Sequence, residues 1–262
     1  MRRFDAEYLT NTRRGMWEDS RGALSPLDLS TRERVLDVGS GTGALTRVLR
    51  EETSGNVIAV DADPRLLEHV EGPAVVGDGF RLPFPADTFD LVVCQALLIN
   101  LPDPVSALRE FARVSRDAVA VIEPDNGSVT VESTVDAEPG LAREARERYL
   151  AGVDTDVTLG SGVQSLLADA DLSDVTVTRY DHARTISPPY SESDVESARR
   201  KASGEGLGTD RATLLDGGLT PEAYDSLRQR WRQMGRDVIE QMAERTYERT
   251  ETVPFYVAVG QI

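Results

Sequence analysis

The stretch that decides the fold is Val35-Leu-Asp-Val-Gly-Ser-Gly-Thr-Gly43. A short apolar run leads into a turn with three glycines, and a helical pattern follows from Ala44 to Glu52. Glycines let the backbone approach a ligand closely, and a helix N-terminus offers free N–H groups to a negative group. The stretch therefore predicts a strand, a ligand-binding turn and a helix.

Further apolar runs follow this stretch and alternate with helical patterns. The runs are continuous rather than alternating, as expected for a parallel sheet that is covered on both faces. We expect strands at 34–38, 56–60, 73–76, 89–94, 118–122, 175–178 and 255–259. We expect helices at 44–52, from 64, at 104–115, 138–151, 163–170, near 192–202 and from 220 to about 249, with the rest of 185–218 as loop.

These elements predict an α/β fold: a Rossmann-like, doubly wound sheet of seven mostly parallel strands whose last strand is antiparallel. The predicted organisation is one domain over residues 1–262. Its parts are a helical N-terminal cap (1–32), a Rossmann-like core (33–184), a helical insertion or lid (185–252) and the last strand (253–262).

The charge composition of the chain bears on the kind of substrate to expect. The chain of 262 residues has 45 Asp and Glu against 29 Lys and Arg, a net charge of −16, and Lys201 is its one lysine. Such a surface repels a phosphate backbone, so a nucleic-acid substrate is not expected. The excess of acid with almost no lysine resembles salt-adapted proteins of the cytoplasm, although an ordinary acidic protein is the alternative.

Other classes of protein and site are not expected either. The chain has a single cysteine, Cys94, and two histidines, His69 and His182, so neither a disulfide nor a common zinc site is predicted. No apolar run is long enough for a membrane helix, and the first residues lack the apolar core of a secretory signal. A soluble protein in the cytoplasm is the expectation.

The glycine turn alone fits two cofactors. Gly39, Gly41 and Ala44 also match the dinucleotide pattern G-x-G-x-x-A, and Asp61 lies where a ribose-binding acid belongs. An NAD-binding dehydrogenase is therefore one alternative.

Four segments favour a cofactor other than NAD: VLDVGSGTG (35–43), VIAVDADP (57–64), VVGDGFRLPFPADTFDLVVCQALLINLPDP (75–104) and AVAVIEPDN (118–126). In order and spacing they resemble the class I S-adenosylmethionine-dependent methyltransferases, in particular the small-molecule branch of the ubiquinone and menaquinone biosynthesis enzymes (methyltransferase type 11). The resemblance implies S-adenosylmethionine as cofactor, S-adenosylhomocysteine as product and a small-molecule methyl acceptor. A third alternative is a non-catalytic protein that binds S-adenosylmethionine.

The resemblance also implies roles for individual residues. Asp37 would help to hold the methionine amino group, and Asp61 would accept hydrogen bonds from both ribose hydroxyls. Asp61 or Asp63 could instead cap the helix that begins at Pro64. The other residues expected to bind the cofactor are Gly39, Gly41, Gly43, Ala62, Asp78, Gly79, Phe80 and Gln95.

The sequence assigns no catalytic residue and no metal ligand. Many relatives place a histidine near the positions that Asn100 and Leu101 hold here. His182 is expected on the surface, and a general base is the alternative for it. The acceptor pocket is expected from the N-terminal cap and from residues 126–160 and 185–250. In the cap, Tyr8, Arg13 and Trp17 could close over the cofactor or could instead pack the cap onto the sheet. The insertion could also form a dimer surface, so a homodimer is a further prediction.

Overall fold

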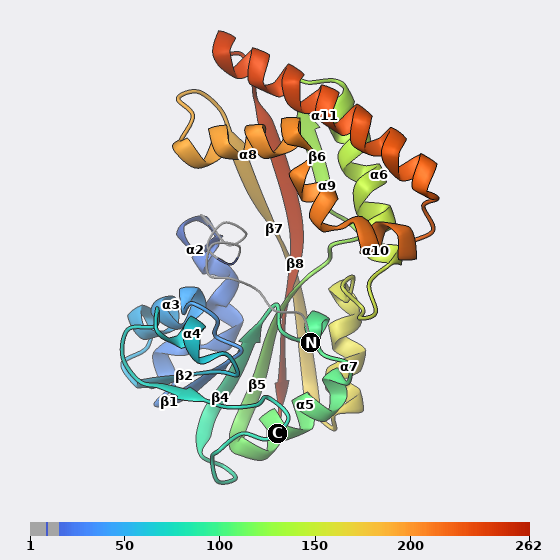
Figure 1. Ribbon diagram of the computed structural model, residues 1–262. Coiled ribbons are helices and arrows are strands. Elements are labelled where there is room, and N and C mark those ends of the chain that lie inside the picture. Colours follow the sequence, from blue (N-terminus) through green and yellow to red (C-terminus); the bar gives the residue numbers. More distant parts are fainter. Residues whose placement is uncertain (1–8, 10–15) are drawn as a thin grey trace. The chain divides into compact units, whose positions relative to one another are not determined.

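The computed structural model describes residue 9 and residues 16–262, so Tyr8 and Arg13 lie outside the described residues. The chain divides into two compact units (Figure 1). Among the described residues, the first comprises residue 9 and residues 16–125, 158–182 and 254–262, and the second comprises residues 126–157 and 183–253. Within the described part of the chain, each helix is either too short or too polar to cross a membrane.

The first unit is built on a mostly parallel sheet. Strands β1 (Arg34–Val38), β2 (Asn56–Asp61), β3 (Ala74–Val76), β4 (Phe89–Gln95) and β5 (Ser115–Pro124) run parallel in the order β3-β2-β1-β4-β5. Strand β8 (Arg249–Gln261) pairs antiparallel with β5, and β7 (Ser173–Ile186) pairs with β8. The order reverses between β1 and β4, which is the switch point where open α/β sheets bind ligands.

Both faces of this sheet are buried, as the continuous apolar runs predict. Leu36, Val38 and Val92 face one apolar cluster, which contains side chains of α5 (Pro104–Val114) and α7 (Val163–Asp169). Val35 and Val93 face the other, which contains side chains of α3 (Ala44–Glu52) and the N-terminal segment. The predicted doubly wound α/β fold is confirmed.

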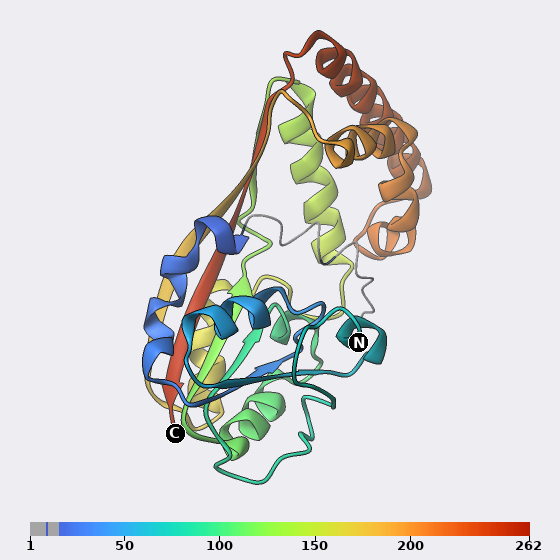
Figure 2. The same cartoon turned by 90° about the vertical axis from the view of Figure 1, so that its left-hand side faces the viewer.

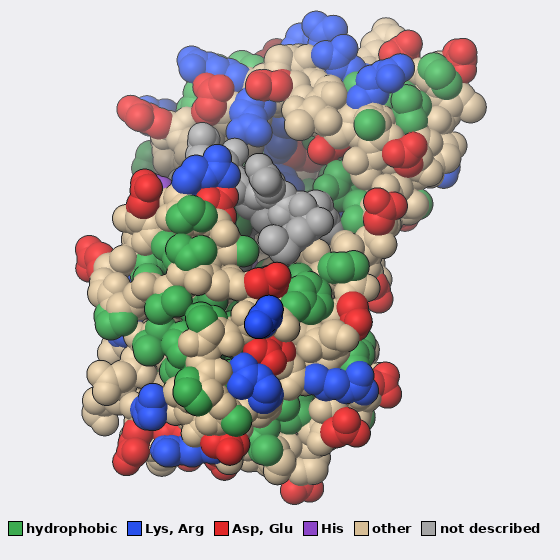
Figure 3. Space-filling view, turned by 60° about the horizontal axis from the view of Figure 1, so that its bottom comes forward, with side chains coloured by type: hydrophobic (Ala, Val, Ile, Leu, Met, Phe, Trp, Pro, Cys, Tyr) green, Lys and Arg blue, Asp and Glu red, His purple; other side chains and the backbone are tan. Residues whose placement is uncertain are grey.

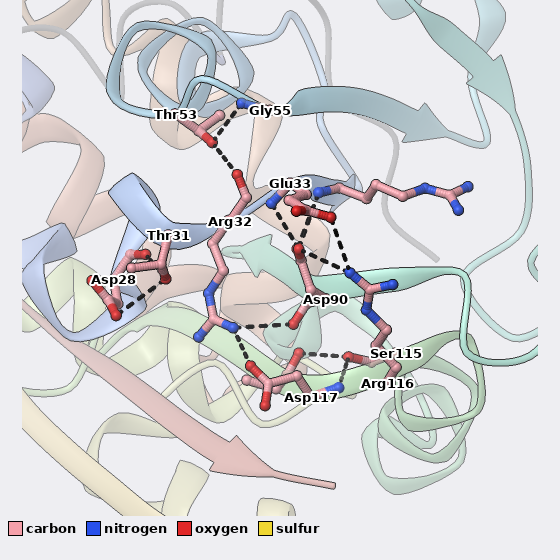
Figure 4. Close-up of polar contacts among 12 residues, drawn as sticks. Asp28, Thr31, Arg32, Glu33, Thr53, Gly55, Asp90, Ser115, Arg116 and Asp117 are labelled. Carbon is pink, nitrogen blue, oxygen red and sulfur yellow. Dashed lines mark hydrogen bonds and ion pairs between the residues drawn. The ribbon is translucent and has the colours of Figure 1, made fainter.

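Side chains close the amino ends of three parallel strands (Figure 4). The carboxylate of Asp90, on β4, accepts hydrogen bonds from the backbone N–H of Glu33 (2.7 Å) and of Arg34 (3.2 Å) beside β1. Arg32 forms an ion pair with Asp117 on β5, and Arg116 lies 3.6 Å from Asp90. These contacts tie β1, β4 and β5 together at one end.

The described part of the N-terminal cap is helical, but mostly as 3-10 helix. It contains α2 (Met16–Asp19) and the 3-10 helices η1 (Arg21–Leu27) and η2 (Leu29–Thr31). Pro26 lies inside η1 and has no N–H to donate, which favours short helical turns over one α-helix. Trp17 and Leu27 are fully buried in the apolar cluster of this face.

The second unit is mainly helical. Its helices are α6 (Ala137–Ala151), α8 (Glu192–Ser203), α9 (Glu205–Thr209), α10 (Arg211–Asp216) and α11 (Pro221–Glu244), and α8 and α11 lie side by side in Figures 1 and 2. The short strand β6 (Thr130–Ser133) pairs antiparallel with the first residues of β8. The buried residues of these elements form a separate apolar cluster.

Three sequence-based expectations fail in this unit. Residues 204–218 are not loop, because Leu207 and Leu214 are buried and hold α9 and α10 in the cluster. The last long helix ends at Glu244 and not near Arg249, because Arg245 adopts a left-handed conformation that caps it (φ 60°). Strand β6 is an eighth strand that the apolar pattern does not reveal, since its residues are exposed or half-buried.

Candidate cofactor site

The glycine turn after β1 adopts the strained geometry that its sequence predicts. Gly39, Gly41 and Gly43 all have positive φ, at 70°, 56° and 81°. Residues with a Cβ rarely adopt these angles, so the turn depends on glycine. The N–H groups of Gly39 and Ser40 both donate to the carbonyl of Val60, at 2.8 and 3.0 Å. The turn is thereby fixed to the end of the neighbouring strand β2.

Asp61, the last residue of β2, bridges the same two strand ends. One of its carboxylate oxygens accepts from the N–H of Gly41 at 2.8 Å, and the other accepts from the N–H of Asp63 at 2.8 Å. Helix α4 (Pro64–Leu67) is capped by Asp63, whose carboxylate accepts from the N–H of Arg65 at 3.0 Å. Asp61 is therefore not the helix cap, and each of its oxygens keeps acceptor capacity for a ligand.

Asp37 lies beneath the turn and is 1 % exposed. Its carboxylate accepts a hydrogen bond from the hydroxyl of Thr46, on the first turns of α3, at 2.5 Å. This bond fixes α3 to β1, so Asp37 sets the direction in which the helix leaves the glycine turn.

The end of β3 lies next to β2, where the resemblance expects adenine contacts. The N–H of Gly77 donates to the carbonyl of Asp61 at 3.0 Å, which joins the two strand ends. Asp78 is exposed and forms a local turn, in which its carboxylate accepts from the N–H of Phe80 at 3.0 Å. Gly79 and Phe80 are half-buried, and Ala62 is exposed beside Asp61.

The end of β4 is buried under the N-terminal segment. Gln95 is 4 % exposed, and its amide donates to the sulfur of Met16 at 3.0 Å. Trp17 packs edge-on against Phe255, with ring centroids 6.4 Å apart. Met16 of the cap therefore contacts the end of β4, whereas Trp17 packs on β8 of the sheet, and closure of the cap over the cofactor stays a prediction.

The sequence-based prediction gives no role to two residues of this region, Glu123 and Leu97. Glu123 is fully buried on β5, and its carboxylate accepts from the N–H groups of Leu97 and Leu98 at 3.0 and 2.8 Å. Leu97 is thereby held against the glycine turn, where its side chain lies 2.8 Å from the place a Cβ on Gly39 would occupy. In the sequence, the sign of this role is that an acid, Glu123, directly follows the apolar run 118–122.

These residues fit an adenosyl cofactor. Acceptor oxygens of Asp61 and Asp78 lie at the ends of β2 and β3, next to a turn with little side-chain bulk. Ser40 adds a hydroxyl that is buried and has no hydrogen-bond partner among the described residues. Hydroxyls of a ribose and amino groups of an adenine are the donors that such acceptors suit.

The two histidines and the cysteine are not among the residues expected to bind the cofactor. His182 is buried (5 % exposed), so its expected surface position is wrong; it lies on β7 rather than in a loop. His69 is exposed, and Cys94 is buried in β4, where burial raises the pKa of its thiol. Residue 9 and residues 16–262 contain no cluster of side chains suited to hold a metal ion.

Comparisons with known proteins find methyltransferases. Residues 36–122 match the family described as "Methyltransferase domain". The 2-methyl-6-phytyl-1,4-hydroquinone methyltransferase 2 of Oryza sativa is 40 % identical over 113 residues, which are 39 % of this chain and 32 % of that protein. The demethylmenaquinone methyltransferase of Corynebacterium urealyticum is 34 % identical over 124 residues, 46 % of this chain and 50 % of that protein.

A solved structure supports the fold over a longer range. The crystal structure of a candidate methyltransferase from Bacillus halodurans superposes with a TM-score of 0.53 at 14 % identity, covering 93 % of this chain and 98 % of that one. The chain spans half or less of the length of the two curated relatives above. Both relatives are named methyltransferases, so the dinucleotide alternative is not favoured. The comparisons therefore identify residues 36–122 as a methyltransferase domain.

Proposed function

We propose that the protein transfers a methyl group from S-adenosylmethionine to a small-molecule acceptor. The observation that carries the proposal is the position of Asp61, whose carboxylate bridges the glycine turn after β1 and the end of β2, beside the switch point of the sheet. The proposal includes one methyltransferase domain over residues 1–262. Assembly as a homodimer stays a prediction.

In this proposal Asp61 accepts from the two ribose hydroxyls with the lone pairs that its backbone bonds leave. Gly39, Gly41 and Gly43 let the backbone approach the ligand, and Asp37 holds the methionine amino group directly or through water. The remaining proposed contacts are made at the ends of β3 and β4, by Ala62, Asp78, Gly79, Phe80 and Gln95.

When bound, the cofactor supplies a methyl group that its sulfonium has already activated. The protein therefore needs no nucleophile of its own for the transfer. Its residues orient the acceptor in line with the methyl group and exclude water, and orientation alone contributes roughly 7–11 kcal/mol. The buried end of β4, with Gln95 under Met16, keeps water from one side of the site.

A broad acceptor screen tests this function. The protein is incubated with S-adenosylmethionine carrying a labelled methyl group and with fractions of small metabolites, in salt that keeps it folded. We expect labelled product with the wild type and none with Asp61→Ala. Binding of the cofactor without labelled product in any fraction would instead support the non-catalytic alternative.

Nucleic acid is not expected among the acceptors. On the face shown in Figure 3, acidic and basic side chains are interspersed and form no continuous basic patch. Together with the net charge of −16, this favours a small acceptor.

A further inference from the structure

The second unit has a groove on its surface that the proposed transfer does not use. It lies between α6 and α11, which contact each other within this unit, and its volume is about 620 Å³. All of its lining residues belong to the second unit, so its geometry does not depend on the first. A volume of this size is typical of sites for small molecules, which measure roughly 300–1,000 Å³.

The two helices run antiparallel along the groove. Towards one end, the carboxylate of Glu144 accepts hydrogen bonds from both terminal nitrogens of Arg230, at 2.9 and 2.7 Å. At the other end, the side chains of Thr134 and Gln241 are joined by a hydrogen bond of 2.6 Å. Asp237 lies one turn before Gln241 on α11 and is therefore level with the first turn of α6.

The middle of the groove has a small and apolar lining. Leu141 and Met234 are buried in the apolar cluster of this unit, and Ala137 and Gly140 line the same groove from α6. A Cβ on Gly140 would meet no atom within 4 Å. Alanine would fit at this position and is more favourable than glycine within a helix, so the glycine keeps the groove open at a cost to the helix.

The charges along the groove are distributed unevenly. The end with the Glu144–Arg230 ion pair also has Arg143 and Glu147, whose charges are opposite, so this end is neutral. At the first turn of α6, the described lining residues include two carboxylates and no guanidinium group. The groove therefore has an excess of two negative charges, and this excess lies at one end.

The two carboxylates at this end, those of Asp136 and Asp237, keep acceptor capacity. Asp136 stands at the position of a helix cap, but its side chain makes no capping hydrogen bond and has no hydrogen-bond or ion-pair partner among the described residues. Asp237 accepts one hydrogen bond, from the amide of Gln233 at 2.8 Å, through one of its two oxygens. An ammonium group, with three donors and one positive charge, complements such a pair of carboxylates.

We propose that this groove binds an organic cation, with a primary ammonium group at Asp136 and Asp237 and an apolar body over Leu141 and Met234. Charge complementarity disfavours the other occupants: an anion would meet the two carboxylates, and a second copy of the chain would bring a net charge of −16 to this groove. The proposal is independent of the proposed function, because it assigns neither the cofactor nor the methyl acceptor to the groove.

The test measures binding of 2-phenylethylamine, and of 2-phenylethanol as its neutral analogue, to the full-length protein by calorimetry at constant ionic strength. We expect the amine to bind at least about tenfold more tightly than the alcohol, the factor expected for one charge-assisted hydrogen bond. Asp237→Asn should weaken binding of the amine by a similar factor. The matched control is Asp225→Asn, an exposed aspartate on the same helix and outside the groove, which should change the affinity less than about twofold.

A second pair of variants tests the open space of the groove. Gly140→Leu would fill the groove with a side chain whose first atom meets no neighbour. Gly206→Leu, on α9 of the same unit, is the matched control, because a Cβ there also meets no atom within 4 Å. We expect Gly140→Leu to abolish binding of the amine and Gly206→Leu to leave it unchanged, with folding of both variants checked by circular dichroism.

Equal affinity for the amine and the alcohol, no binding of the amine, or binding that Gly140→Leu leaves intact would overturn the proposal. If Gly140→Leu does not fold, the comparison of Asp237→Asn with Asp225→Asn decides. S-adenosylhomocysteine binding is measured on the same samples. A wild type that binds S-adenosylhomocysteine but not the amine refutes only this proposal, and the reverse result refutes only the proposed function.

Discussion

The two ends of the parallel strands in the first unit are built differently. At the amino ends, the side chains of Asp90, Arg32 and Asp117 close the sheet with hydrogen bonds and ion pairs to protein groups (Figure 4). At the carboxyl ends, glycines and backbone N–H groups form the turn, and Asp61 keeps unused acceptor capacity. One end uses its polar groups for stability and the other keeps them for a ligand.

This difference predicts that the two ends respond to mutation in separate ways. Changes at the carboxyl ends should weaken cofactor binding. Changes at the amino ends should lower the free energy of unfolding and leave the affinity unchanged.

The largest expected effect is that of Asp61→Ala on binding of S-adenosylhomocysteine. Two hydrogen bonds to a charged acceptor are lost at roughly 1.5–3 kcal/mol each, so calorimetry should show a dissociation constant at least about 150-fold higher. The control is Asp63→Ala in the same loop, which removes a helix cap and should cost about 1 kcal/mol of stability. Equal loss of affinity in both variants would contradict the assigned role of Asp61.

The second-largest effect is expected for Gly39→Ala. The new Cβ would lie 2.8 Å from Leu97 at a φ of 70°, and strain of this kind costs about 2–3 kcal/mol of unfolding free energy. Denaturant unfolding measures it. Gly22→Ala, whose Cβ would meet no atom within 4 Å, serves as control and should be neutral. A neutral Gly39→Ala would show that the turn tolerates a side chain.

Asp90→Ala tests the opposite end. It leaves the N–H groups of Glu33 and Arg34 without their acceptor in a site where Asp90 is 7 % exposed, at a cost of about 2 kcal/mol. Denaturant unfolding should show this loss, while the affinity for S-adenosylhomocysteine stays within twofold. A large loss of affinity would mean that the two ends are not independent.

Thr53→Val has the smallest expected effect. The hydroxyl of Thr53 donates to the carbonyl of Arg32 at 2.8 Å and accepts from the N–H of Gly55 at 3.1 Å. Losing these neutral bonds at nearly constant shape should cost about 1 kcal/mol in the same unfolding experiment. A cost above that of Asp90→Ala would reverse the order expected for charged and neutral acceptors.

The sequence predicts the first unit better than the second for a physical reason. Buried parallel strands such as β1 and β4 are continuous apolar runs, and the glycine turn is local in the sequence. Strand β6 and helices α9 and α10 have no such local pattern and depend on tertiary packing.

The residues of the candidate site are also predictable only where the signal is local in the sequence. Residues that follow a strand, such as Asp61, can be found from their place in the sequence. The role of Glu123 depends on Leu97 and Leu98, and the buried Glu138 pairs with Lys201 and Arg249, which lie far along the chain, so only the folded chain shows either.

The most direct measurement is a crystal structure of the protein with S-adenosylhomocysteine bound. We expect the ribose hydroxyls on the carboxylate of Asp61, the amino-acid part over the glycine turn of residues 39–43, and the contacts at the amino ends of the strands unchanged. A ligand bound away from the ends of β1 and β2, or a ribose that does not reach Asp61, would contradict the account.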